Sequence, residues 1–216
     1  MTDKHWEQLL QVLQGEVLNP LPIAFIIDSP WLPNWYSHKI IDYFSNDRVW
    51  LEGNLNAINS FPQAMFLPGF WSEFGMCTEP SSFGSRSMFP PNEFPHAFPV
   101  IKNPEDIDSL HMPNPATDGL LPLMLNRLKL NQAAIEDSGH KIRFAVARGP
   151  LNIASYLVGT TEFMTMLLLE PDAAEKLVRK VTDFLKNWID LQRETFPTID
   201  GIFLLDDIIG FMGGPE

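Results

Sequence analysis

Residues 201–207 read GIFLLDD, an apolar run that ends in two adjacent carboxylates, Asp206 and Asp207. An apolar run of this length without polar interruption is typical of a buried strand in a parallel sheet. Two carboxylates at the tip of such a strand are costly, because burial removes their hydration. Since side chains alternate along a strand, we expect one aspartate to face a pocket and the other the following helix or loop. A functional role for at least one of them is favoured over a purely structural one.

The same pattern recurs twice along the chain. The run IAFIID ends in Asp28, and the run IRFAVAR ends in Arg148, just before a Gly-Pro pair. A further strand is predicted at 63–67, and helical periodicity separates the strands, which predicts an α/β fold with a parallel sheet covered on both faces. Such folds place their chemistry at the carboxyl ends of the strands. We therefore expect the charged ends to share a pocket, although any one of them could instead cap its strand at the solvent boundary.

Three helices are predicted with clear boundaries. The first lies in the amino-terminal helical segment, about residues 1–20, and ends at Gly15; another ends at Gly139. The third follows Pro171 and presents a continuous apolar face over about seven turns. Residues 72–122 are rich in proline and phenylalanine with little periodicity, and a stretch of that length predicts a folded excursion rather than a loop.

Composition limits the class of protein. The chain has 216 residues, of which 45% are hydrophobic and 19% charged, as in globular proteins, and its net charge of −12 argues against binding to nucleic acid or an anionic membrane surface. The single cysteine excludes an intrachain disulfide framework and suits a reducing cytoplasm. The first ten residues lack the apolar core of a signal peptide, and no apolar run approaches the roughly 18 residues of a membrane span. We therefore expect a cytoplasmic location.

Two segments outside the aspartate pair carry residues suited to chemistry. Arg148 is always charged and could clamp a carboxylate, either of an acidic substrate or of a neighbouring strand. Tyr156 follows on a helix, where its hydroxyl could reach the site or simply pack. The loop at 68–77 carries Glu73 and Cys77, and a lone cysteine without a nearby histidine is usually a small buried hydrophobe.

The sequence offers no metal or nucleotide motif. Its five histidines are scattered, with no pair at the spacing of metal ligands, so no metal site is predicted within the chain. A glycine-rich phosphate loop and a G-x-S-x-G elbow are also missing from the sequence, which argues against phosphotransfer and serine hydrolysis.

Three segments taken together resemble the uroporphyrinogen decarboxylase superfamily, which also contains cobalamin-dependent methyltransferases. They are RGPLNIASYLVGTTEFMTMLLLEPDAAEKLVRKVTDFL, NPEDIDSLHMPNPATDG and IFLLDDIIGF. The resemblance runs from about Pro22 onward and is strongest over 99–210. It implies a (β/α)8 barrel with the site at the carboxyl mouth of the strands. With strands at about 23–28, 63–67, 142–147 and 201–205, the chain is expected to be a single partial domain over 1–216, truncated to roughly the first half of the barrel.

Residue by residue, the resemblance departs from the decarboxylases. Tyr156 falls on their substrate-contacting tyrosine, whereas Asp207 stands where they have a substrate-contacting serine. Their arginine-bearing loop after the first strand is replaced by DSPWLPNWYS, at 28–37. Their catalytic aspartate has no clear equivalent, and Glu73 is the nearest carboxylate. A pocket that loses arginines and gains acids does not suit a porphyrinogen with eight carboxylates, so uroporphyrinogen decarboxylation is not expected.

The resemblance fits the methyltransferase branch better. There, zinc held by a His-x-Cys pair and a later cysteine lowers the pKa of a thiol, which attacks a methyl group carried by a corrinoid on a partner protein. Those ligands would lie beyond Glu216. The chain would then supply catalytic and substrate-binding residues, namely Asp206 and Asp207 for catalysis and Asp28, Trp31, Glu73, Arg148 and Tyr156 for binding.

Two alternatives remain open. The protein could be a cofactor-free decarboxylase of a smaller carboxylated substrate, with an aspartate as general acid. It could also be a catalytically inert half-barrel, whose unpaired strand edges and apolar inner face would favour a homodimer or aggregation.

Overall fold

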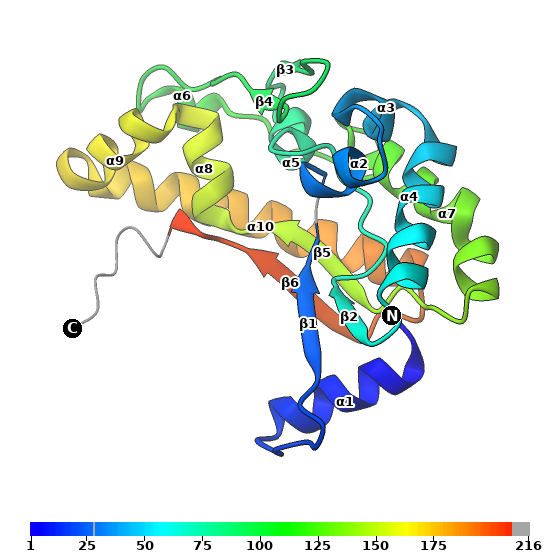
Figure 1. Cartoon of the computed structure of the whole chain (residues 1–216). Helices are drawn as coiled ribbons and strands as arrows, with labels where there is room; N and C mark the ends of the chain where they lie inside the picture. The colour runs from blue at the N-terminus through cyan, green and yellow to red at the C-terminus, as the bar shows by residue number, and fades with distance from the viewer. Residues whose placement is uncertain (28, 209–216) are drawn as a thin grey trace.

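The computed structural model describes residues 1–27 and 29–208, so Asp28 lies outside the described residues. The described residues form six strands and ten helices, and helices separate the longer strands along the chain (Figure 1). The strands are β1 (Ile23–Ile26), β2 (Ala64–Leu67), β3 (Ser87–Met88), β4 (His96–Ala97), β5 (Phe144–Arg148) and β6 (Gly201–Leu205). The helices are α1 (Asp3–Leu13), α2 (Trp31–Trp35), α3 (Ile40–Ser45), α4 (Asp47–Ser60), α5 (Thr78–Ser82), α6 (Asp106–Ser109), α7 (Leu121–Asp137), α8 (Pro150–Val158), α9 (Thr160–Leu169) and α10 (Pro171–Thr195).

The four longer strands form two separate parallel pairs. β1 pairs with β2, with Ile23 opposite Ala64, and β5 pairs with β6, with Phe144 opposite Gly201. The short strands β3 and β4 pair antiparallel with each other. The fold is therefore mixed α/β with parallel strands, as the apolar runs predict. Over the described part of the chain, however, the strands form three two-stranded sheets and no closed barrel.

Side chains explain why β2 and β5 do not join. In a parallel pair only alternate residues of a strand face the partner, so Val146 and Arg148 turn their backbone groups away from β6. The Gln192 amide of α10 both donates to the Val146 carbonyl and accepts from its N–H, each at 3.0 Å. The Arg148 N–H donates to Glu79 Oε1 at 3.1 Å. Because these groups occupy the second edge of β5, the expected continuous sheet is interrupted there.

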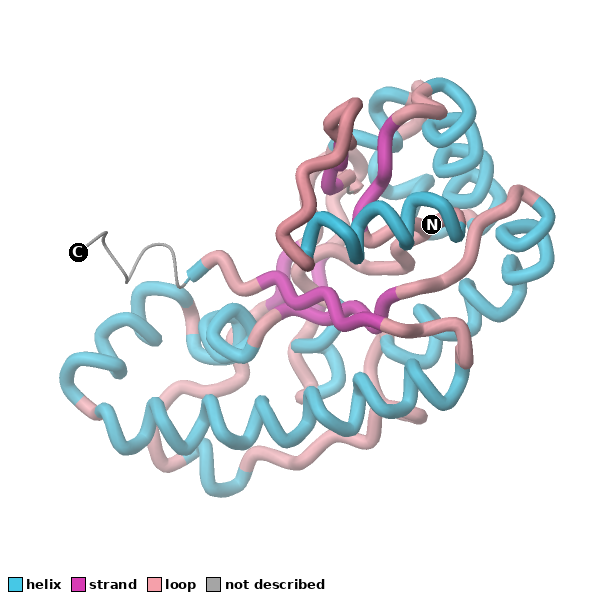
Figure 2. The backbone as a smooth tube through the Cα atoms, turned by 90° about the horizontal axis from the view of Figure 1, so that it is seen from below, coloured by secondary structure: helices cyan, strands magenta, loops and turns pink. Residues whose placement is uncertain are grey.

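The core lies mainly between α10 and β5 together with the helices around them. The buried side chains of α10 include Leu177, Val181, Phe184 and Trp188, which recur at the spacing of one helical face. Figure 2 shows α10 on one side of β5 and β6, with α1 on the other. From α1, Trp6 meets Phe144 edge to face at 5.3 Å between ring centroids. This packing makes β5 the most deeply buried strand.

The proline-rich stretch is a folded excursion, as the sequence predicts. It contains α5, β3, β4 and α6, and α5, β3 and β4 lie with α2 on the side toward which the strands point (Figure 1). The backbone N–H groups of Val100 and Ile101 donate to the Leu157 carbonyl at 2.8 and 2.9 Å, and Leu120 donates to Ser81 Oγ at 2.8 Å. The first two bonds fasten the excursion to α8, and the third joins the end of the excursion to α5 within it.

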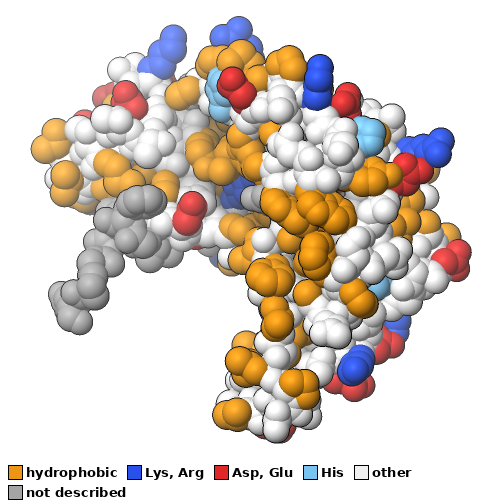
Figure 3. All heavy atoms as spheres, viewed as in Figure 1, with side chains coloured by type: hydrophobic (Ala, Val, Ile, Leu, Met, Phe, Trp, Pro, Cys, Tyr) orange, Lys and Arg blue, Asp and Glu red, His pale blue; other side chains and the backbone are white. Residues whose placement is uncertain are grey.

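The expectation that both sheet faces are covered is wrong for β1 and β6. All four residues of β1 are exposed, and in β6 Ile202 and Leu204 are exposed while their neighbours are half-buried. Figure 3 shows apolar side chains gathered on this face of the molecule. The apolar runs do form strands, but among the described residues no helix covers β1 as α10 covers β5. No helix in that part of the chain is both long and apolar enough to cross a membrane.

Candidate functional site

A cavity of about 370 Å³ opens at the carboxyl ends of three parallel strands, β1, β5 and β6. Both aspartates of the GIFLLDD stretch line it. Figure 3 shows the hollow from one side, with basic and acidic side chains inside and an apolar rim. The cavity is lined by Ile26, Trp71, Met76, Phe94, Arg148, Asn152, Leu205, Asp206 and Asp207. The charged ends of β5 and β6 therefore share a pocket, as the sequence predicts.

Asp206 holds the first turn of α8. Its two carboxylate oxygens accept the backbone N–H groups of Leu151 and Asn152 at 3.1 and 3.0 Å, the role that an N-cap side chain usually fills from within the helix. The close approach requires glycine at 149, where an added Cβ would lie 2.2 Å from the Asp206 Cβ. Burial raises the pKa of the Asp206 carboxyl, and the neighbouring Asp207 charge adds to the rise, against the two N–H bonds that lower it.

Asp207 is exposed and bonds to the side chain of Asn152, the residue whose backbone N–H Asp206 accepts. Its Oδ1 accepts a hydrogen bond from the Asn152 amide, whose nitrogen also donates to the Leu205 carbonyl at 3.1 Å. The Asn152 oxygen accepts the Ile208 N–H at 3.3 Å, so this one amide ties the end of β6 to α8. Both aspartates line the cavity and bond to α8, so their contacts do not divide them between pocket and helix as expected. They differ in exposure: Asp206 is half-buried with both oxygens bound, whereas Asp207 is exposed with one oxygen bound by the described residues.

Arg148 lines the cavity but is largely buried, and its charge is paired with a carboxylate of the protein. Its Nη2 donates to Glu73 Oε2 at 3.1 Å, and both side chains are almost fully buried. Glu73 Oε1 in turn accepts the Ser29 N–H at 3.3 Å. The guanidinium lies 5.8 Å from the centre of the Trp71 ring, a cation–π contact. Of the two roles open to Arg148, the structure shows a bond to a carboxylate of the protein itself.

Glu79 is a buried carboxyl that no sequence pattern indicates. It lies on α5, is 3% exposed, and accepts the Arg148 N–H on Oε1. Its Oε2 has no hydrogen-bond partner in the part of the chain that the structure describes. Burial raises the pKa of Glu79, while the Arg148 charge and the N–H bond lower it less strongly. The guanidinium of Arg148 forms its ion pair with Glu73, while Glu79 accepts the Arg148 backbone N–H.

Tyr156 lies one helical turn after Asn152 on α8. Its hydroxyl donates to the thioether sulfur of Met76 at 2.8 Å, and Met76 lines the cavity. Burial raises the pKa of the Tyr156 hydroxyl, the Arg148 charge lowers it, and the Asp207 charge raises it further. Tyr156 thus contacts Met76, and the charges of both Arg148 and Asp207 act on its hydroxyl.

Of the predicted binding residues that the structure describes, Arg148 lines this cavity, whereas Trp31, Glu73 and Tyr156 do not. Trp31 stacks on Trp35 at 5.3 Å between ring centroids and belongs to an exposed aromatic cluster with Phe61. That cluster borders a separate hollow of about 340 Å³. Asp28, predicted to bind substrate, lies outside the described residues. Cys77 is fully buried and burial raises the pKa of its thiol, which agrees with its interpretation as a small hydrophobe.

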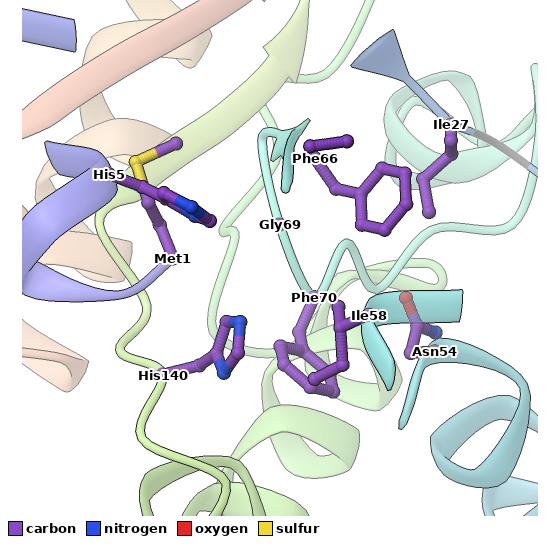
Figure 4. Close-up of a pocket in the computed structure, with 10 residues that line it drawn as sticks. Met1, His5, Ile27, Asn54, Ile58, Phe66, Gly69, Phe70 and His140 are labelled. Atoms are coloured by element: carbon purple, nitrogen blue, oxygen red, sulfur yellow. The ribbon is translucent and has the colours of Figure 1, made fainter. Parts of the chain in front are cut away.

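A second enclosed space lies elsewhere, between α1 and the segments after β2 and α7 (Figure 4). Its volume is about 10 Å³, room for no more than about one water molecule. His5 and His140 face it, and burial lowers the pKa of both. Over residues 1–27 and 29–208, no group of three or more His, Cys, Asp or Glu side chains is placed to hold a metal ion. We therefore assign this space to packing.

Sequence patterns give little warning of Glu79, Asn152 and Met76. Asn152 stands two positions after Pro150, in the first turn of a helix. Its amide indicates a contact with the end of a strand only once the Asp206–Asp207 pair is known to lie opposite. Glu79 lies within the proline-rich stretch at 72–122, which has little periodicity, so its burial could not be predicted from neighbouring residues. These positions become visible only through contacts across more than 50 residues of sequence.

Comparison with known proteins places this architecture among relatives. The chain matches the family model described as uroporphyrinogen decarboxylase over residues 5–203. A comparison with curated proteins gave no match. Among solved structures, a methyltransferase from Methanosarcina mazei is similar, with a TM-score of 0.66 and 19% sequence identity. The match covers 92% of this chain and 57% of that one, so the chain has the fold of a little over half of the methyltransferase.

Proposed function

Because the chain belongs to the uroporphyrinogen decarboxylase family, we propose that it is a small-molecule enzyme of the methyl-transferring branch of that family. Its site is the cavity at the carboxyl ends of β1, β5 and β6. The observation that carries the proposal is the presence of both terminal aspartates and Arg148 in the wall of one cavity. Parallel α/β folds place their active sites at this edge.

The proposal includes a partial (β/α)8 barrel. β1, β2, β5 and β6 would be its first four strands, and helical segments follow β1, β2 and β5 in the chain. Two features support this: the pairs run parallel, and the match covers only 57% of the similar methyltransferase. The exposed apolar residues of β1 and β6 would then face the remaining strands.

The cavity suits a small substrate better than uroporphyrinogen. At about 370 Å³ it lies toward the lower end of the range of ligand pockets. Arg148 is the one lysine or arginine among its lining residues, and that charge is already bonded to Glu73. A ligand with many carboxylates would meet two aspartates here and no unpaired cation in the described wall. The predicted exclusion of uroporphyrinogen therefore gains structural support.

The residues take distinct roles in the proposed site. Asp207 is the catalytic candidate, because its carboxylate is exposed at the cavity and is positioned by Asn152. Asp206, with both oxygens bound to α8, holds that helix and the groups it carries. The Glu73–Arg148 pair forms a fixed wall, and Tyr156 supports Met76.

Zinc does not fit the residues described. They offer no cluster of metal ligands, and Cys77 is buried. We assign no step to zinc in this part of the chain, and we place a corrinoid on a partner protein, because the cavity has the size of a small ligand.

A second candidate function is cofactor-free decarboxylation of a small acid. One observation favours it: burial raises the pKa of Asp206, as a general acid requires. Its two oxygens are engaged by the helix, however, and in this reaction they would have to exchange those bonds with the substrate.

The test is an assay of methyl transfer from free methylcobalamin to a small thiol, 2-mercaptoethanol. The reaction is monitored by the loss of methylcobalamin absorbance. We expect activity in the wild type and a loss of at least about tenfold in Asp207→Asn, with a nearly unchanged melting temperature. Asp190→Asn, which alters an exposed carboxylate on α10, is the control and should keep full activity. Absence of methyl transfer, together with release of CO₂ from small carboxylic acids, would replace this function with the decarboxylase. Normal turnover in a destabilised Asp207→Asn would make the aspartate structural.

A further inference from the structure

We propose that the cavity binds a small methylated ammonium cation, held between the Asp207 carboxylate and an aromatic wall of Trp71 and Phe94. This inference rests on the proposed function, because it names the substrate class of the same site. It comes from the balance of charge in the wall and from the apolar surface beside it.

The wall carries a net negative charge. Arg148 is the one cation among the described lining residues, and Glu73, which does not line the cavity, pairs with it at 3.1 Å. Neither Asp206 nor Asp207 forms an ion pair with a lysine, arginine or histidine of the described chain. Asp206 is bonded to two backbone N–H groups and Asp207 to an amide. A ligand with a positive charge would therefore supply what the wall lacks.

Asp207 is the aspartate that can accept a further hydrogen bond. Its only hydrogen bond within the described residues is made through Oδ1 and comes from Asn152, so Oδ2 is left for a ligand. Asp206, by contrast, uses both oxygens. The cation would thus lie on the Asp207 side of the cavity.

The rest of the wall is apolar and aromatic, which decides the kind of cation. Trp71, Phe94, Met76, Ile26 and Leu205 contribute most of its lining. Trp71 already has the Arg148 guanidinium beside it, whereas Phe94 has no ring or cation partner elsewhere in the described structure. An aromatic face without a partner attracts a methylated ammonium group, and the methyl groups gain contact with the aliphatic wall.

A primary ammonium suits this wall less well. It carries three donors that need acceptors and a strongly bound hydration shell. Here Asp207 Oδ2 is the main acceptor on offer, while the Met76 sulfur already accepts the Tyr156 hydroxyl. A methylated nitrogen has fewer hydrogen-bond donors or none, so it loses fewer hydrogen bonds to water when it enters the cavity. An anion would have to displace Glu73 from Arg148 beside two carboxylates.

The experiment compares three probes of similar shape by titration calorimetry with the purified protein. They are choline, a cation; 3,3-dimethylbutan-1-ol, its neutral carbon counterpart; and 3,3-dimethylbutanoate, an anion. We expect choline to bind about tenfold or more tightly than the neutral alcohol, and the anion not to bind. The choline affinity should fall as salt is raised, because the attraction is partly electrostatic.

Variants locate the binding. Asp207→Asn should weaken choline binding by about tenfold or more, and Phe94→Leu by about threefold or more, with unchanged melting temperatures. Asp190→Asn should bind like the wild type. Equal binding of choline and the alcohol, tighter binding of the anion, no binding of any probe, or choline binding unaffected by Asp207→Asn would each overturn the inference.

The outcome is separable from that of the methyl-transfer test. Choline binding that depends on Asp207, without transfer from methylcobalamin, would leave this inference standing and refute the proposed function. Transfer in a protein that does not bind choline would do the reverse.

Discussion

β5 and β1 are both short apolar strands of a parallel pair, yet their surroundings differ. In β5, FAVAR, every residue but the first is buried; in β1, IAFI, every residue is exposed. α10 and the Gln192 amide cover β5, whereas among the described residues no hydrogen bond joins β1 to any strand but β2. This difference shows that an apolar run predicts a strand but does not predict which element will cover it.

We expect the largest effect when the same substitution, phenylalanine to alanine, is made once in the core beside β5 and once on β1. Phe184 on α10 is 0% exposed and meets Phe83 edge to face at 4.9 Å, while Phe25 on β1 is 54% exposed. Phe184→Ala should lower the free energy of unfolding by about 3–5 kcal/mol, because it leaves a cavity in the core. Phe25→Ala should lower it by about 0.5 kcal/mol or less, as for an exposed site. Urea unfolding measures both.

Equal destabilisation by the two substitutions would contradict the contrast between β5 and β1. If Phe25→Ala were as destabilising as Phe184→Ala, β1 would be covered in solution. Repeating the unfolding at several protein concentrations would then tell whether a second copy supplies the cover, since only in that case does stability depend on concentration.

The sequence predicts the elements well where the signal is local. The strand at 201–205 matches β6, and the helix after Pro171 extends from Pro171 to Thr195. The strand predicted at 142–147 is shifted by one or two residues in β5. Burial and sheet continuity depend on distant residues instead. Nothing near Val146 in the sequence indicates that the side chain of Gln192 will occupy its backbone groups.

The candidate site follows the same division. That Asp206, Asp207 and Arg148 meet in one pocket could be predicted, because parallel strands bring their carboxyl ends to one edge. Their partners could not be predicted. Trp31 is attractive in the sequence for its place after β1, but the aromatic rings of Trp35 and Phe61 hold it in another hollow.

The second prediction sharpens the contrast at the tip of β6, between two adjacent carboxylates. Asp206→Ala removes the acceptor of two N–H groups in the first turn of α8 and should cost about 1 kcal/mol of stability, as the loss of a helix cap does. Asp207→Ala should cost about 0.5 kcal/mol or less, because that side chain is exposed. Thermal and urea unfolding measure the two. Equal losses would show that Asp207 also supports the fold and would weaken its assignment as the catalytic candidate.

The smallest expected effect at neutral pH concerns Glu79, on the buried side of the comparison. Its pKa is raised above the ordinary value of 4.5, because burial disfavours the charged form. The folded protein therefore binds this proton more tightly than the unfolded chain does. The resulting stability is fully present below pH 4.5 and is lost as the pH rises through the raised pKa.

Glu79→Gln keeps an oxygen for the Arg148 N–H and does not titrate, so it isolates this contribution. We expect the free energy of unfolding of the wild type, minus that of the variant, to be greatest at acid pH and to fall as the pH is raised toward 8. Urea unfolding at a series of pH values measures the difference, and Glu194→Gln, an exposed carboxylate on α10, should show no comparable trend. A difference that stayed constant, or rose with pH, would mean that Glu79 is charged in the folded protein. Arg148 would then be shared between two carboxylates, and the net negative charge of the site would be larger than its cavity wall suggests.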